Sequence, residues 1–309
     1  MENSGRLPHE AADIVVDIQS LEASVGDFTL SINKLISISG GRSVALIGHN
    51  GAGKSFLLET LAGYNRTTSS VGTLLNRPIG LAAIDLELKK KLGVQLRRNA
   101  WPQDVSVRDL VALHKGLYPV QDVAVANALK LQEIESTRYG ALSTGQRQRV
   151  DLFMALAHRP ALALLDEPGS GLDSNFADQL RALIVRRSAK ESFLFAVHED
   201  VALDTADMII WLSGGRVIAS GPKDQVIRDS VGTYFVRMEA SLAHDIAGLQ
   251  HELKDIRGVV AVFREGQILT AFGNDTLVDY RSKMDLAPVS YSEGPSTTAH
   301  FLSIVGKPS

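Results

Sequence analysis

An eight-residue stretch, GHNGAGKS from Gly48 to Ser55, has the residue types and spacing of a phosphate-binding loop. It fits the pattern G-x-x-x-x-G-K-S/T and lies between a strand-like segment, SVALIG, and a helix-like segment, SFLLETLAGY. Glycines allow backbone N–H groups to surround phosphate oxygens, and a helix N-terminus adds favourable dipole charge. In such a loop Lys54 would reach the β- and γ-phosphates, and the Ser55 hydroxyl would contact Mg²⁺.

A second group of candidate residues follows apolar runs that read as buried strands. The run ALALLDEP carries Asp166 to a C-terminal strand edge, which is where open α/β sheets bind ligands. There Asp166 would hold Mg²⁺ through water, and Glu167 would polarise an attacking water. His198 ends the run SFLFAVH at the same kind of edge, and we expect it to contact a γ-phosphate.

The segment LSTGQRQRV, from Leu142 to Val150, places Ser143 and Gly145 before a strong helical pattern. It is therefore a second helix start that could receive an anion. One chain does not need two phosphate sites. The economical interpretation is that this segment covers a nucleotide held by a second subunit.

The elements that must position these residues alternate along the chain. The buried-strand patterns SVALIG, ALALLD, SFLFAVH and MIIWLS are separated by helical patterns, which favours a parallel α/β sheet. A strand-like segment precedes them, helical periodicity runs from 104 to 131, and SGGRVIASGP reads as a hairpin. After about residue 230 the pattern changes. VGTYFVRMEASLAHDIAGLQHELKDI reads as one long helix, and VVAVFREGQILTAFG as a hairpin that turns at Glu265 and Gly266; a helix and a short apolar C-terminus follow.

Composition limits the possible classes of protein. The chain has 309 residues, 45% of them hydrophobic, which suffices for one large domain plus a small appendage. A net charge of -3 gives no electrostatic case for nucleic acid, so we expect no nucleic-acid partner. The absence of cysteine excludes disulfides and cysteine-ligated zinc. We find no signal-peptide pattern and no apolar stretch near the ~20 residues that span a bilayer, so we expect a protein that is soluble or reaches a membrane only through a partner.

In order and spacing, these motifs resemble those of the ATP-binding cassette (ABC) ATPases over about residues 13–222. GHNGAGKS resembles their Walker A, LSTGQ their signature motif, ALALLDE their Walker B with its catalytic glutamate, SGLD (Ser170–Asp173) their D-loop, and His198 their switch histidine. The resemblance implies an α/β fold, the P-loop NTPase ABC nucleotide-binding domain, with a parallel-sheet core, an antiparallel β subdomain and an α-helical subdomain over about 97–150. We expect this domain over 13–230, after a loose tail over 1–12 and before a small α+β extension over 231–309.

The resemblance also implies an ATPase that uses ATP and Mg²⁺, with two ATP molecules sandwiched in a head-to-tail dimer that closes on binding and opens on hydrolysis. A homodimer is the simpler expectation. Glu167 and His198 would be catalytic, and Ser55, Asp166 and Gln95 would hold Mg²⁺. The expected ATP contacts are Gly48, His49, Asn50, Gly51, Ala52, Gly53, Lys54, Ser55, Phe56 and Val25, with Ser143, Gly145 and Gln146 contributed by the facing subunit.

Two departures from the family pattern concern the nucleotide. Val25 stands where the family stacks an aromatic residue on adenine, so the base would lose much of its stacking, typically ~1–3 kcal/mol, unless Phe28 substitutes. We therefore expect weaker selection for adenine. Phe56 stands where a threonine usually touches the α-phosphate; it offers no hydroxyl, but the backbone amides remain.

The third departure is in LGVQLRRN, Leu92 to Asn99, which reads as a strand. Arg97 falls at the position of the Q-loop glutamine, and arginine cannot coordinate Mg²⁺. Gln95 lies on the same face of the strand and could take over only if the strand slides. Four alternatives stay open for Arg97: a contact with the nucleotide phosphates, with Glu167, with an acidic residue of a partner, or with solvent only.

The resemblance finally implies a transporter subunit that docks on separate transmembrane permease subunits, and so lies on the cytoplasmic face of the cell membrane. GPSTTAHFLSIVGKP, Gly294 to Pro308, resembles the closing segment of ABC-2 type exporter ATPases, with Phe301, Leu302 and Gly306 matched and Thr298 and Ala299 in place of the usual acidic pair. This suggests export of a hydrophobic or amphipathic compound, a polysaccharide or a peptide. The alternatives are a soluble ABC ATPase, such as an iron–sulfur assembly type, and a structural cassette that does not hydrolyse ATP.

Overall fold

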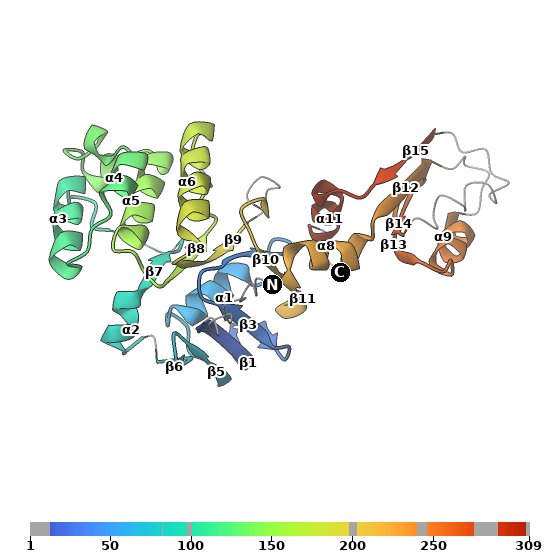
Figure 1. Ribbon diagram of the computed structural model, residues 1–309, viewed down its shortest axis with the longest axis horizontal. Helices are drawn as coiled ribbons and strands as arrows, with labels where there is room; N and C mark the ends of the chain where they lie inside the picture. The colour runs from blue at the N-terminus through green and yellow to red at the C-terminus, as the bar shows by residue number, and fades with distance from the viewer. Residues whose placement is uncertain are drawn as a thin grey trace, which may run out of the picture. The chain divides into compact units, whose positions relative to one another are not determined.

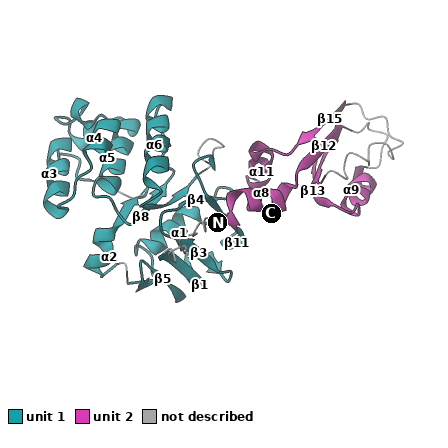
Figure 2. Cartoon of the chain, viewed as in Figure 1, with its two compact units in different colours: residues 1–220, 308–309 teal, residues 221–307 magenta. Residues whose placement is uncertain are grey.

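The computed structural model describes residues 13–81, 83–97, 101–197, 203–239, 246–274 and 290–306, so the expected tail lies outside the described residues. The chain forms two compact units that divide between residues 220 and 221 (Figure 2). The sequence pattern placed this division at 230. The second unit begins earlier because helix α8 (Lys223–Val231) packs against α11 and β13 of that unit.

A six-stranded sheet forms the centre of the first unit. Four successive neighbour pairs are parallel, which confirms the predicted parallel α/β core. Three of its strands are buried at every residue, as expected where both faces of a sheet are covered. In spatial order the strands are β11 (Arg216–Pro222), β10 (Met208–Ser213), β4 (Ser43–Ile47), β9 (Ser192–Ala196), β8 (Leu162–Asp166) and β7 (Leu92–Gln95).

A five-stranded antiparallel sheet packs beside it through a shared apolar core. Side chains such as Ile18 from this sheet, Leu46 from β4 and Leu57 from α1 (Lys54–Leu61) belong to one buried cluster. Figure 1 shows the ribbon of α1 beside the strands of this sheet. The helix that carries the phosphate loop is therefore held by both sheets. The strands are β2 (Phe28–Ile32), β1 (Ile14–Val25), β5 (Ser69–Leu74) and β6 (Arg77–Pro78), with β3 (Ile36–Ser39) also paired to β1.

The helical region includes α5, which packs against β7 of the central sheet, and its helices are capped by polar residues of the same region. Ser106 accepts a hydrogen bond from the Asp109 backbone N–H, and Asp173 accepts one from Phe176, each at the start of a helix. The periodic segment 104–131 contains two helices, one in each of its two helical patterns, VSVRDLVALHKGLY and VQDVAVANALKL. The elements are α2 (Leu86–Lys91), α3 (Val107–Leu117), α4 (Val123–Ala128), the 3₁₀ turns η1 (Leu131–Glu133) and η2 (Tyr139–Ala141), α5 (Thr144–Leu156) and α6 (Ser174–Arg187).

The second unit corrects one element of the sequence analysis. Residues 234–239, expected within a long helix, form strand β12 (Tyr234–Glu239), because Val236 and Met238 are buried with a period of two. The helix α9 (Ile246–Lys254) then begins after the gap in the described residues.

The hairpin that turns at Gly266 is confirmed, as β13 (Val259–Glu265) and β14 (Ile268–Gly273). With β15 (Ser290–Pro295) these strands form an antiparallel sheet in the order β13-β14-β12-β15. The apolar C-terminus forms α11 (Thr298–Val305), where Phe301 is fully buried. The helix expected before it lies outside the described residues.

Candidate functional site

The phosphate loop connects β4 to α1 and is shaped by close backbone packing. A Cβ atom at Gly48 would lie 2.1 Å from the Leu212 carbonyl oxygen, and both Gly48 and Gly53 have positive φ, 150° and 103°. Lys54 donates from Nζ to the carbonyl oxygens of Gly48, at 2.6 Å, and His49, at 3.1 Å. Burial lowers the pKa of Lys54, while Glu167 and Asp166 oppose that lowering. The lysine thus lies across its own loop and faces the acidic pair.

Asp166 ends β8 and is 2% exposed. The Ser55 hydroxyl hydrogen-bonds its carboxylate; this contact and Arg97 lower the pKa of Asp166, but burial raises it more. The second carboxylate oxygen, Oδ1, is buried and has no hydrogen-bond partner among the described residues. A buried oxygen left without a donor, beside a serine hydroxyl, is what an oxygen-coordinated cation such as Mg²⁺ requires. The residues present therefore fit the metal that the sequence analysis expected.

Arg97 contacts the same acidic pair, and these contacts decide between the four alternatives that the sequence left open for its side chain. Its Nη2 pairs with Glu167 Oε2, and its Nε lies 3.8 Å from Asp166 Oδ2. The side chain is nonetheless 62% exposed, so one face of the pair is in contact with water. Of the four alternatives, the structure shows the contact with Glu167.

The Gln95 side chain is directed to the backbone of Asp166. Its side chain is 2% exposed, and Nε2 donates to the backbone oxygen of Asp166 at 3.3 Å, while Oε1 is buried without a partner among the described residues. The parallel register pairs Gln95 with Leu165, so the glutamine stops one residue short of the acidic pair. Its amide lies beside the Asp166 backbone, and no sliding of β7 is visible.

The signature segment is organised by contacts within the same chain. Ser143 and Gln146 form a capping box at the start of α5: Ser143 Oγ accepts from the Gln146 N–H at 3.3 Å, and Gln146 Oε1 accepts from the Ser143 N–H at 2.9 Å. A Cβ atom at Gly145 would lie 2.5 Å from the Gly171 carbonyl oxygen of the D-loop. The sequence analysis gave Gly145 a role towards a facing subunit; the D-loop contact in its own chain requires glycine as well.

Two aromatic residues near the loop turn inward. The rings of Phe28 and Phe56 meet edge to face with centroids 5.7 Å apart, and Phe56 is 9% exposed. The Phe28 ring also lies 2.8 Å from the position that a Cβ atom on Gly53 would take, so the ring packs against the backbone of the phosphate loop. Only the backbone of Phe56 therefore remains for a phosphate. Val25, at the end of β1, is 52% exposed and free of the core cluster.

A polar cavity of about 490 Å³ opens beside the acidic pair, between the ends of β7 and β8 and helix α5. Sequence reasoning missed Asp151 in its wall. Asp151 accepts hydrogen bonds from Trp101 Nε1 at 3.0 Å and from the Tyr139 hydroxyl at 3.1 Å, and burial raises its pKa to about 6. A carboxylate inside the otherwise apolar run VDLFMAL was the available signal.

Gln148 fixes the turn that carries Glu167. Its Nε2 donates to the backbone oxygens of Glu167, at 3.3 Å, and Pro168, at 3.0 Å. Glu167 has a φ of 50°, which non-glycine residues rarely adopt, so these bonds hold a strained backbone in place. His198, the third residue expected at this edge, lies outside the described residues.

Comparisons with known proteins give one family. The family described as "ABC transporter" matches residues 33–170. The ferric enterobactin transport ATP-binding protein FepC of Escherichia coli is 31% identical over 225 residues, which cover 68% of this chain and 82% of FepC. The phosphonates import ATP-binding protein PhnC 2 of Haloarcula marismortui is 29% identical, over 63% of this chain and 80% of that protein. The Nod factor export ATP-binding protein I of Rhizobium meliloti is 25% identical, over 78% of this chain and 74% of that protein.

A solved structure has the same fold. It is described as the ATP binding subunit of an ABC transporter, superposes with a TM-score of 0.61 at 21% identity, and is matched over 92% of its length by 69% of this chain. The described helices of this chain include none that is long and apolar enough to cross a membrane.

Proposed function

The chain belongs to the ABC transporter family and is an ABC-type ATPase, and on that premise we propose that it drives transport through separate transmembrane permease subunits. The observation that carries the proposal is the meeting of Lys54, Ser55 and Asp166 at one edge of the parallel sheet. These groups come from two elements more than a hundred residues apart in the chain. Their meeting supports a site for ATP with Mg²⁺ rather than an ordinary glycine turn.

We assign the following roles to the residues at this edge. Lys54 and the loop backbone bind the β- and γ-phosphates. Ser55 and Asp166 hold Mg²⁺, which when bound supplies positive charge to the phosphate oxygens. Glu167 orients and polarises the attacking water. His198 is assigned to the γ-phosphate from the sequence alone.

The active assembly in this proposal is a head-to-tail homodimer. Ser143 is exposed and Gly145 and Gln146 are half-buried at the start of α5, so this surface is accessible to the ATP of a facing subunit. The free N–H groups of a helix start favour an anion there. Val25 lies beside the base and covers it by apolar contact only. All the hydrolytic motifs lie in one chain, which is why a second copy of the same chain suffices.

We further propose that the transporter is an exporter of the ABC-2 type, with this subunit on the cytoplasmic face of the membrane. The named relatives include importers and an exporter, so their names support transport and leave its direction open. The proposal of export rests on the segment Gly294–Pro308 alone. Co-purification tests it: detergent-extracted membranes should yield the chain with a multi-span protein, and recovery only with ribosomes or cytosolic scaffolds would contradict it.

The ATPase assignment is tested by Glu167→Gln and Lys54→Ala. Removing the base should slow hydrolysis at least 100-fold, because general-base catalysis contributes about 10²–10⁴-fold, and should trap a closed dimer with ATP. Lys54→Ala should abolish ATP binding and therefore the dimer. Phosphate release and size-exclusion chromatography measure both effects. Glu167→Gln with undiminished turnover, or without dimer, would contradict the roles assigned here.

A further inference from the structure

Arg97 and Glu167 meet because two parallel strands end side by side. The register pairs Gln95 on β7 with Leu165 on β8, so the second residue beyond each pair is Arg97 on one chain segment and Glu167 on the other. The guanidinium contacts Glu167 and also approaches Asp166 Oδ2 at 3.8 Å. One cation therefore faces both carboxylates that the proposed function assigns to water activation and to Mg²⁺.

Lys54 and Arg97 both lie near this acidic pair. Burial lowers the pKa of Lys54, and the charge of Arg97 adds to that lowering, which means that the two cations are electrostatically close. The Arg97 side chain lines the polar cavity of about 490 Å³ and is 62% exposed. It therefore has room to move, and water weakens its hold on Glu167.

The observed pairing conflicts with the roles proposed for the carboxylates. Glu167 can accept a proton from water only if one of its oxygens is free and close to that water. A guanidinium close to Asp166 also repels a divalent cation bound to the same carboxylate. The observed arrangement is thus one that hydrolysis must first undo.

We propose that Arg97 is a positioning residue that exchanges partners: it holds Glu167 and Asp166 in the nucleotide-free protein and moves to the γ-phosphate oxygens when ATP is bound. A planar guanidinium can bind two phosphate oxygens at once, as it binds a carboxylate. The exchange removes the guanidinium from Glu167 and its positive charge from Asp166. The inference rests on the proposed ATPase function and goes beyond it, since it makes the γ-phosphate the signal that releases the base.

The test is Arg97→Gln, with two measurements that should change in opposite directions. Without metal, in EDTA, calorimetric binding of ATP should weaken about tenfold, while binding of ADP, which lacks the γ-phosphate, should stay unchanged. In hydrolysis assays the half-saturating Mg²⁺ concentration should fall about tenfold, because a unit charge near the metal site has been removed. Arg97→Lys keeps the charge and loses the planar fork, so it should keep the Mg²⁺ dependence of the wild type and lose most of the ATP preference.

Arg108→Gln is the matched control, because the Arg108 side chain is 67% exposed, a fraction similar to that of Arg97, and pairs with Glu135 at 2.8 Å outside the acidic cluster. It should change neither measurement. Equal weakening of ATP and ADP binding by Arg97→Gln would show a merely structural role, and no weakening at all would show that Arg97 never reaches the γ-phosphate; either result overturns the exchange. A wild-type chain that binds no ATP would overturn the proposed ATPase site together with it.

Discussion

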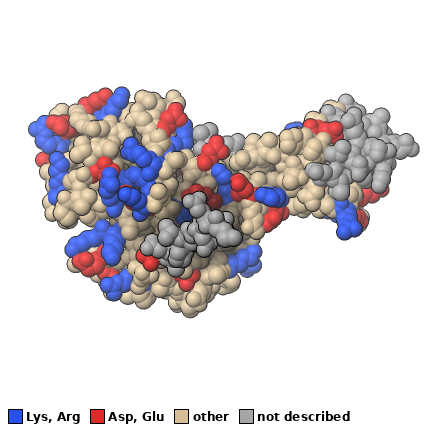
Figure 3. All heavy atoms as spheres, viewed as in Figure 1, with Lys and Arg blue, Asp and Glu red and all other residues tan. Residues whose placement is uncertain are grey.

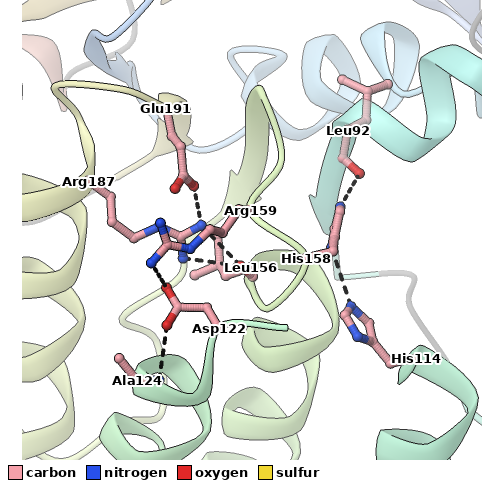
Figure 4. A network of polar contacts seen from close by, with 9 residues as sticks. All are labelled: Leu92, His114, Asp122, Ala124, Leu156, His158, Arg159, Arg187 and Glu191. Atoms are coloured by element: carbon pink, nitrogen blue, oxygen red, sulfur yellow. Dashed lines mark hydrogen bonds and ion pairs between the residues drawn. The ribbon is translucent and has the colours of Figure 1, made fainter. Parts of the chain in front are cut away.

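Two arginine–glutamate pairs in the first unit have the same chemistry and opposite surroundings. Arg97 and Glu167 have side chains that are 62% and 17% exposed, whereas those of Arg187 and Glu191 are 5% and 9% exposed. Arg187 also donates to the backbone oxygen of Leu156 from both terminal nitrogens, each at 3.1 Å (Figure 4). The first pair lies at a partly exposed edge, whereas the arginine of the second pair is also bonded to a backbone acceptor in the interior.

The first unit therefore contains one arginine–glutamate pair that has room to change partners and one that is fixed by its surroundings. Around Arg187 the neighbouring polar groups are also tied to backbone. Asp122 pairs with Arg159 at 3.0 Å and caps α4 through the Ala124 N–H (Figure 4). At the acidic edge, Asp166 Oδ1 is left without a partner among the described residues. Arg187 Nε is also buried without a hydrogen-bond partner among those residues, so the two regions differ in exposure and not in whether every polar atom is satisfied.

On the face shown in Figure 3, visible positive and negative side chains of the described residues lie among uncharged ones. The net charge of the chain is only -3.

Breaking the buried pair should have the largest effect. Arg187→Met leaves Glu191 buried without its partner, which typically costs about 3–5 kcal/mol of unfolding free energy. The two tryptophans, Trp101 and Trp211, both lie in the first unit, so urea unfolding followed by tryptophan fluorescence measures this loss. The double change Arg187→Met with Glu191→Leu should recover most of it. If the single change proves harmless, the pair is not the fixed contact described here.

A second, intermediate effect concerns the buried histidines (Figure 4). His158 donates from Nε2 to the Leu92 carbonyl oxygen at 3.1 Å, and its Nδ1 lies 3.3 Å from His114 Nε2. His158 is 7% exposed, so burial in the interior disfavours its charged form. Burial is the main cause that lowers the pKa of His158, from 6.5 to about 4.

The direction of the pH dependence of stability follows from which state, folded or unfolded, binds the His158 proton at the higher pH. The unfolded chain takes up the proton first as the pH falls, so the stability contributed by neutral His158 is present above pH 6.5 and is lost towards pH 4. The expected loss is about 2–3 kcal/mol. Unfolding curves at several pH values should show the slope, and His158→Gln should reduce it.

The smallest effect is expected at the exposed pair. Arg97→Gln should change the unfolding free energy by at most about 1 kcal/mol, because water screens the pair. The same urea unfolding experiment compares the loss of unfolding free energy in this variant with the loss in Arg187→Met. A loss as large as that of the buried pair would remove the contrast and show that Arg97 is structural.

Much of the fold could be predicted because its signals are local. The fully apolar runs became β4, β8 and β9, and the residues of the phosphate loop have the positive φ values that glycine permits. The strand β12 was mistaken for helix, since Tyr234–Glu239 is short and its alternation is masked by the helical pattern that follows. Asp151 was overlooked because its partners, Trp101 and Tyr139, are brought to it only by folding.

By itself the sequence determined the phosphate loop, the acidic strand edge and the order of the motifs, because each depends on neighbours within a few residues. Only the tertiary structure decided which groups meet: Arg97 with Glu167, Gly145 with Gly171, and Phe28 with Phe56. These contacts depend on strand register and on packing between elements distant in the chain. A shift of one residue in the pairing of β7 with β8 would give Glu167 a different neighbour.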